Sequence, residues 1–240
     1  MQKYKIADIV FTAKTEYPYT ENLCKDYIYD GDENPAFSVE ITKADVEKEL
    51  LQSKDIPLDI LESLALYRKL CDYLIENADG MIFHSSALAI DNKAYLFAAP
   101  SGTGKSTHAW GWRTVFGDKV VMINDDKPII RKIGDKFYAY GNPWNGKHNI
   151  GENIRVEIDA ICMLGRGEEN SIRKITPKEM IPTVLNQTLR YADQEKMDKV
   201  LNLVSGLMEK AKLFSLKCNM TREAVFTSYN AMVKGEGYEN

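Results

Sequence analysis

The sequence has little of what builds disulfide frameworks, zinc sites or membrane spans. Only four of its 240 residues are cysteines, and Cys24, Cys71, Cys162 and Cys218 are too far apart to form a C-x-x-C pair. This spacing favours reduced, buried thiols. No apolar run approaches the roughly 20 residues that a membrane helix needs. The N-terminus also lacks the pattern of a signal peptide. We therefore expect a cytoplasmic protein.

A strong charge of one sign is also missing. The chain has 31 lysines and arginines against 35 aspartates and glutamates, for a net charge of −4, and the two signs are interspersed along it. A dedicated nucleic-acid surface is therefore not expected. The hydrophobic fraction of 44% and the length of 240 residues are enough to bury a full core. These properties leave the globular enzymes and binding modules.

The most informative segment is 94–107, AYLFAAPSGTGKST, in which a short apolar run leads through a glycine-containing loop into a helix-compatible stretch. Glycines at 102 and 104 allow a tight turn with inward N–H groups. The helix N-terminus adds its dipole to the same anion site. The spacing predicts a phosphate loop of the Walker A type, although Ala99 stands where the usual pattern has its first glycine. The expected nucleotide-binding residues are Ser101, Gly102, Thr103, Gly104, Lys105, Ser106 and Thr107.

Lys105 and Ser106 have separate expected roles within this loop. The lysine can reach the outer phosphates of ATP, and the serine hydroxyl can hold Mg²⁺. The alternative interpretation is a glycine-rich turn with a chance lysine. A glycine turn followed by Lys-Ser-Thr between a strand and a helix is much rarer than a loose glycine motif, so we favour nucleotide binding.

Asp125 and Asp126 follow the next apolar strand and are the expected chemical half of the site. Strand ends and helix N-termini converge on ligands at this edge of an α/β sheet. One carboxylate can support Mg²⁺ while the other takes the proton of an attacking hydroxyl, and the residues alone do not say which does which. The alternative is an ordinary acidic turn.

The periodicity predicts an α/β fold: a mixed sheet containing hairpins, flanked by helices. Helices are expected at 58–78, 108–116, from 176, at 194–210 and from 221 to 235, and strands at 4–12, 81–90, 93–98, 119–123, 129–133, 137–140, 158–164 and 213–218. We expect two regions, an α+β region of unknown role at 1–79 and a nucleotide-binding kinase domain at 80–240.

Four further side chains are candidates for a role in catalysis. His84 lies in the strand expected before the phosphate loop, although a lone histidine there is more often a hydrogen-bonded core residue. Lys147, Arg155 and Arg166 could neutralise charge on a transferring phosphoryl group. Each of the three, taken singly, is better explained as an ordinary surface charge.

The pairing of S-G-T-G-K-S-T at 101–107 with I-N-D-D at 123–126 resembles the C-terminal domain of HPr serine kinase and the related ATP-type phosphoenolpyruvate carboxykinases. Segments 142–147 and 164–167 are similar to segments of smaller HPr-kinase-like proteins. The resemblance implies a P-loop kinase fold, phosphate and metal positions at Lys105 and Ser106, an acidic pair at Asp125 and Asp126, and a supporting role for His84. The chain departs from the kinase pattern at Ala99 and at Thr107, where that family has glutamate. HPr kinase carries a separate N-terminal domain where this chain has only about 80 different residues, and the lysine and histidine set of the carboxykinases is not seen in the sequence.

We therefore predict a serine-type kinase that uses ATP and Mg²⁺ to phosphorylate a hydroxyl, with serine of a protein or peptide as acceptor. A small-molecule hydroxyl such as that of free serine is the nearest rival acceptor. A regulatory nucleotide-binding module with little catalysis also stays open, as does a structural partner that docks a peptide through the N-terminal region. No nucleic-acid or membrane partner is expected, and a homo-oligomer is compatible with the sequence.

Overall fold

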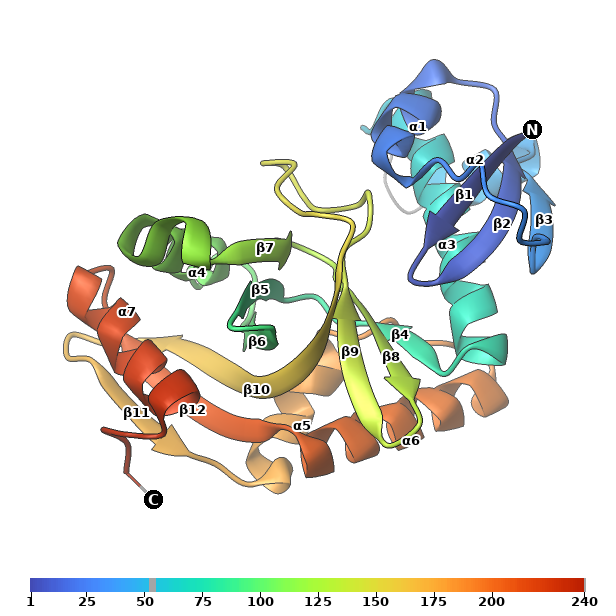
Figure 1. Cartoon of the computed structure of the whole chain (residues 1–240). Helices are drawn as coiled ribbons and strands as arrows, with labels where there is room; N and C mark the ends of the chain where they lie inside the picture. Colours follow the sequence, from blue (N-terminus) through green and yellow to red (C-terminus); the bar gives the residue numbers. More distant parts are fainter. Residues whose placement is uncertain (52–54, 240) are drawn as a thin grey trace.

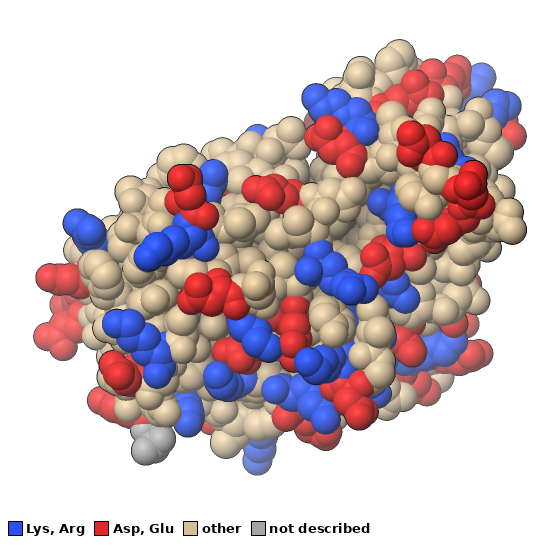
Figure 2. Space-filling view, in the orientation of Figure 1, with Lys and Arg blue, Asp and Glu red and all other residues tan. Residues whose placement is uncertain are grey.

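A computed structural model describes residues 1–51 and 55–239 of the chain, which fold into two sheets and flanking helices (Figure 1). The mixed α/β class expected from the sequence is confirmed. On the face drawn in Figure 2, the positive and negative side chains alternate over the surface, as the interspersed charges indicated. Among the described residues no helix is long and apolar enough to cross a membrane.

The N-terminal unit is a small sheet covered by helices. β1 (Gln2–Ile6) and β2 (Ile9–Lys14) form a hairpin through a turn at residues 7–8, and β3 (Phe37–Glu40) runs parallel to β2. The remaining elements are α1 (Pro18–Leu23), the 3₁₀ turn Lys25–Tyr27, α2 (Lys43–Leu50) and α3 (Leu58–Asn77). The apolar residues of α3 recur at helical spacing, which predicts one buried face. The helix expected at 58–78 is confirmed.

The large sheet has nine strands in the order β4-β8-β9-β10-β6-β5-β7, with β12 beside β10 and β11 beside β12. These strands are β4 (Gly80–Ile82), β5 (Ser86–Ile90), β6 (Lys93–Ala98), β7 (Val121–Asn124), β8 (Ile129–Ile133), β9 (Lys136–Tyr140), β10 (Arg155–Arg166), β11 (Ser171–Lys174) and β12 (Lys212–Cys218). β10 runs parallel to two of its neighbours, β6 and β12. β7 points the same way as β6, because each is antiparallel to β5 between them. The carboxyl ends of all four strands therefore meet at one edge.

Helices cover both faces of this sheet (Figure 1). α4 (Lys105–Phe116) and α7 (Arg222–Tyr229) bury their apolar residues in one cluster with the sheet, and α5 (Pro177–Asn186) and α6 (Gln194–Lys210) do so on the other face. A 3₁₀ turn, Gly117–Lys119, follows α4, and a π-helical turn, Asn230–Lys234, follows α7. A third cluster joins the N-terminal unit to the large sheet through Ile129, Tyr140 and Trp144.

The strands expected at 129–133 and 137–140 form a hairpin, and so do the strand expected at 93–98 and the second half of the strand expected at 81–90, with Asp91 and Asn92 at positive φ in the turn. The strand expected at 81–90 is wrong in one respect, because it splits into β4 and β5, which pair with different strands. His84 consequently lies in the link between them rather than in a strand. The strand expected at 158–164 is longer, since pairing with β9, β6 and β12 extends it to 155–166.

Candidate functional site

The glycine loop, Ala99–Gly104, connects the end of β6 to the start of α4. Gly102 and Gly104 have φ angles of 76° and 119°, and a Cβ at either position would meet nothing within 4 Å. Glycine is therefore needed there for its backbone freedom rather than for space. Ala99 is fully buried and is not among the residues with positive φ, so it takes the place of the usual glycine without left-handed strain.

Lys105, the first residue of α4, turns its side chain back over this loop. Its Nζ donates a hydrogen bond to the Ala99 carbonyl at 2.8 Å, and the residue is 7% exposed. Burial lowers the pKa of Lys105, while the nearby carboxylates of Asp126 and Asp125 act in the opposite direction. An ammonium group has three donors, so two remain available for an anion at the loop.

Asp125 lies directly after β7 and faces the same helix. Ser86 Oγ donates to Asp125 Oδ1 at 2.7 Å. Burial raises the pKa of Asp125, while hydrogen bonds from Ser86 and Ser106 lower it, and the net direction is upward. The hydroxyl of Ser106, the residue after Lys105, thus lies near the buried carboxylate of Asp125.

Asp126 is held by two cationic or ionisable neighbours. His84 Nε2 lies 3.0 Å from Asp126 Oδ1, and Lys127 Nζ lies 2.7 Å from Asp126 Oδ2. Burial raises the pKa of Asp126, but the hydrogen bonds from His84 and Lys127 outweigh it and lower the pKa to about 2. The His84 backbone N–H is fixed in turn by the Gln187 carbonyl at 2.7 Å. The two neighbouring carboxylates therefore have pKa values that are displaced in opposite directions.

Two buried asparagines shape the turn that carries the acidic pair. Asn124 Oδ1 accepts from the backbone N–H groups of Asp126 and Lys127 at 2.9 and 2.7 Å, a side-chain turn that fixes the backbone after β7. Asn142 Nδ2 donates to the Lys127 carbonyl at 2.6 Å. Neither asparagine, nor Lys127, was expected at the site from the sequence. The asparagine before two aspartates was the one available signal, because Asn favours such turns.

The predicted residue Lys147 lies in the loop 141–151, whose start is anchored by these asparagines. Gly146 has a φ of 79°, and a Cβ there would lie 2.9 Å from the Asp126 Cβ. Lys147 itself is exposed. Trp144 is buried in the same loop with its ring 4.7 Å from the Tyr67 ring of α3. The loop therefore passes directly over the acidic pair.

The two predicted arginines occupy opposite ends of β10. Arg166, at its carboxyl end, donates to the carbonyls of Gly102 and Thr103 in the glycine loop. Arg155, at its other end, pairs with Asp8 at 2.9 Å and lies over the Tyr138 ring. The structure therefore brings Arg166 to the loop and attaches Arg155 to the N-terminal unit.

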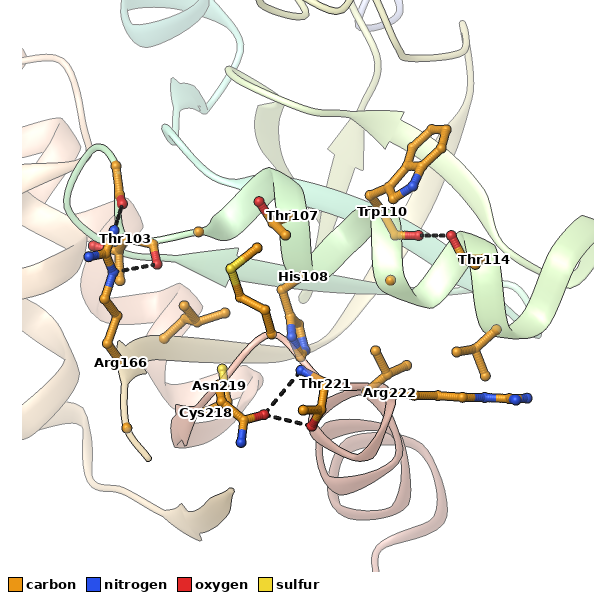
Figure 3. A pocket seen from close by; sticks show the side chains of 18 residues that line it. Thr103, Thr107, His108, Trp110, Thr114, Arg166, Cys218, Asn219, Thr221 and Arg222 are labelled. Carbon is orange, nitrogen blue, oxygen red and sulfur yellow. Dashed lines mark hydrogen bonds between the residues drawn. The ribbon is translucent and has the colours of Figure 1, made fainter. Parts of the chain in front are cut away.

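A cavity of about 960 Å³ opens beside the glycine loop (Figure 3). It lies between α4 and α7 and includes Thr103, Thr107 and Arg166 in its lining. Within the described chain, no group of three or more His, Cys, Asp or Glu residues is arranged to hold a metal ion. A cation at this site would need hydroxyl, carboxylate and ligand oxygens instead.

No protein-family profile matches the sequence, and no curated protein matches it. Among solved structures, the Hpr(Ser) kinase/phosphatase from Coxiella burnetii is similar to 52% of this chain over 93% of its own chain. The two are 12% identical, and the TM-score is 0.31. A likeness at this level carries no argument about the chemistry, which rests on the residues described above.

Proposed function

We propose that the chain is a Mg²⁺- and nucleotide-dependent phosphotransferase that moves the γ-phosphoryl group of ATP to the serine hydroxyl of a protein or peptide. The observation that supports this most directly is the meeting of Lys105 with Asp125 and Asp126 at one sheet edge. An anion-binding loop and a pair of ionisable carboxylates are the two parts that phosphoryl transfer requires.

The glycine loop holds the phosphates in this proposal. Its N–H groups and the start of α4 favour negative charge, and the buried Lys105 supplies a point charge with free donors. Arg166 fixes the loop by binding two of its carbonyls. The loop is thereby ordered before the nucleotide arrives, which reduces the entropy lost on binding.

Ser106 and Asp125 are the residues that fit Mg²⁺. The Ser106 hydroxyl lies close enough to the Asp125 carboxylate to lower its pKa, so two oxygens of the kind that Mg²⁺ prefers are near each other. The ion, when bound, neutralises charge on the phosphates. Burial raises the pKa of Asp125 more than its hydrogen bonds lower it, and a bound cation would offset that cost.

Asp126 is the residue that receives the acceptor hydroxyl. With a pKa of about 2 it is ionised at neutral pH, so it accepts a hydrogen bond from the acceptor hydroxyl and then its proton, as the bond from that oxygen to the γ-phosphorus forms and the bond from the γ-phosphorus to ADP breaks. His84 and Lys127 hold both of its oxygens in place. Lys147, on the loop above, adds positive charge near the transferring group, whereas Arg155 keeps its partner Asp8.

The test is transfer of label from γ-labelled ATP in the presence of Mg²⁺, with bacterial protein and small-molecule fractions as separate acceptors. Asp126→Asn should reduce transfer by about a hundredfold or more while the Kd for MgADP stays within about twofold. Lys105→Ala should abolish nucleotide binding. Asp118→Asn, the same substitution at an exposed site, is the matched control.

The position of the label decides the acceptor. Label on a protein or peptide band that requires Asp126 supports the proposal. Label confined to the small molecules would replace the protein acceptor with a metabolite. Tight binding of ATP without any transfer would contradict the phosphotransferase and favour a regulatory module.

A further inference from the structure

The cavity between α4 and α7 is continuous with the glycine loop, because Gly102, Thr103 and Gly104 belong to its lining. Its volume of about 960 Å³ is at the upper end of the range for small-molecule sites. In Figure 3 the labelled Asn219 and Thr221 lie across the cavity from α4, with His108 projecting toward them. The phosphotransferase proposed above leaves this space without a role.

The cavity and the acidic pair lie beside different strands of the large sheet. The cavity lies at the carboxyl ends of β10 and β12, where Leu164, Arg166, Gly167 and residues 218–221 line it, while Asp125 and Asp126 follow β7. β6 and the glycine loop lie between these two sides. A nucleotide whose outer phosphates point toward the acidic pair must therefore direct its base toward the cavity. Ligands in α/β sheets bind at the carboxyl ends of strands in the same way.

The walls of the cavity suit a flat apolar ring. Val115 of α4, Leu164 of β10 and Val225 of α7 contribute aliphatic side chains, and Met220 lies 83% exposed in the segment between β12 and α7. An exposed methionine in a cavity lining has apolar surface to bury and a flexible, polarisable side chain with which to cover a ring. Burying this surface against an aromatic base would favour binding.

Three polar side chains of the lining, those of Thr114, Asn219 and Thr221, are already hydrogen-bonded within the protein. Thr114 Oγ1 donates to the Trp110 carbonyl at 3.0 Å, and Asn219 Nδ2 donates to the Glu168 carbonyl at 2.9 Å. Thr221 Oγ1 donates to Asn219 Oδ1 at 2.6 Å, which leaves neither amide end of the asparagine unpartnered. A site discriminates strongly between two ligands when the wrong ligand leaves buried polar groups of the protein without a hydrogen bond. These side chains provide no such reader for the edge of a base.

Arg222 is the one cation at the α7 end of this lining. It is exposed, and its guanidinium lies 5.6 Å from the centre of the Phe226 ring. Arginine can bind the O6 and N7 atoms of guanine when it points along the base edge. Here the guanidinium lies over an aromatic ring instead.

We propose that this cavity holds the purine base of the nucleotide by its faces, so that adenine and guanine nucleotides are bound alike. The inference rests on the proposed nucleotide-binding function and extends it to the choice of nucleotide. The phosphates provide the common anchor, and the base adds affinity without specificity.

The test is calorimetric titration of the whole chain with MgADP, MgGDP and Mg-tripolyphosphate, the last of which has phosphates but no base. Thr114→Trp places a large side chain at the exposed rim of the cavity without disturbing a buried residue. It should weaken MgADP and MgGDP together by about tenfold or more and leave Mg-tripolyphosphate unchanged. Lys119→Trp, at an exposed position outside the cavity lining, is the matched control.

Each result distinguishes the base site from the phosphate site. Unchanged nucleotide affinity in Thr114→Trp, with all three ligands still lost in Lys105→Ala, would overturn the base site and leave the proposed function standing. A difference of more than about tenfold between MgADP and MgGDP in the native chain would overturn the face-only recognition. If none of the three ligands binds the native chain, the proposed function itself fails.

Discussion

Lowering the pH from 7 to 5 should destabilise the fold through His108, which lies in the helix that follows the glycine loop. His108 is 7% exposed, and its Nε2 lies 2.9 Å from Ser228 Oγ of α7. Trp112 Nε1 donates to the same oxygen at 3.0 Å, and the imidazole packs on Phe97. None of these partners is charged. Burial lowers the pKa of His108 to about 4 from its ordinary value of 6.5.

The magnitude follows from the two pKa values. Above pH 6.5 the histidine is neutral in both states and contributes no pH dependence. As the pH falls from 6.5 toward 4, the unfolded chain takes up a proton that the folded chain refuses, so stability is lost over that window. At about 1.4 kcal/mol per unit, the loss is about 2 kcal/mol at pH 5 and about 3 kcal/mol at pH 4. This is a large share of the 5–15 kcal/mol that stabilises a typical domain.

Other groups interfere little in this interval or act in the opposite direction. Asp126 and Asp45 have pKa values of about 2, so the stability that they contribute is lost only below their unfolded value of 3.8. The raised pKa of Asp125 acts in the opposite sense, because the folded state regains stability when that carboxyl is protonated. These groups contribute equally to the native chain and to a variant of His108, so they cancel when the changes in unfolding free energy with pH of the two proteins are subtracted.

The assay is urea unfolding of the native chain and of His108→Gln at pH 7 and pH 5, with the amide chosen to keep a hydrogen bond to Ser228. The native chain should lose about 2 kcal/mol more than the variant between the two pH values. Equal losses would refute the reasoning. If the variant does not fold, an NMR titration of the native imidazole decides the question, since a ring that protonates near pH 6.5 contradicts the buried neutral histidine.

Two predictions concern the surroundings of Asp126. Gly146→Ala should slow phosphoryl transfer by about tenfold with little change in MgADP affinity, because position 146 has a positive φ and the added Cβ meets Asp126. Gly134→Ala, at a positive φ in open space, is the control. Equal effects of the two substitutions on transfer would contradict the contact with Asp126. Lys127→Met should move the acid limb of the pH–rate profile to higher pH, because loss of the ammonium raises the pKa of Asp126 from about 2. Lys136→Met is the control. An acid limb that does not move in Lys127→Met would show that Lys127 does not support this carboxylate.

Local signals in the sequence account for most of the elements that were predicted correctly. Thr176, Pro177 and Glu179 predict the start of α5, and the capping box between Thr176 and Glu179 is present. Gly117 ends α4 at a positive φ. In each case the information lies within a few residues of the element that it determines.

Long-range pairing accounts for what the sequence did not predict. β10 lies between β6 and β12, and it pairs with residues of both strands that are more than 50 positions away in the sequence. That pairing brings Arg166 to the glycine loop, and no spacing near Arg166 encodes it. For the same reason Arg155, which looked equivalent in the sequence, lies at the other end of the strand beside Asp8. Two arginines 11 positions apart in the sequence thus acquire different surroundings from the strand that joins them.

The N-terminal unit also acts on the site through packing that joins distant parts of the sequence. Trp144 is buried against Tyr67 of α3, and a Cβ added at Gly146, two residues farther along, would lie 2.9 Å from Asp126 Cβ. α3 therefore limits where the loop 141–151 can lie, and the loop limits where Asp126 can point. Because the buried cluster that contains Trp144 includes residues from both sides of position 79, the region 1–79 supplies part of the wall behind the acidic pair. The proposed acceptor site thus depends on packing from a region in which the sequence shows no catalytic motif.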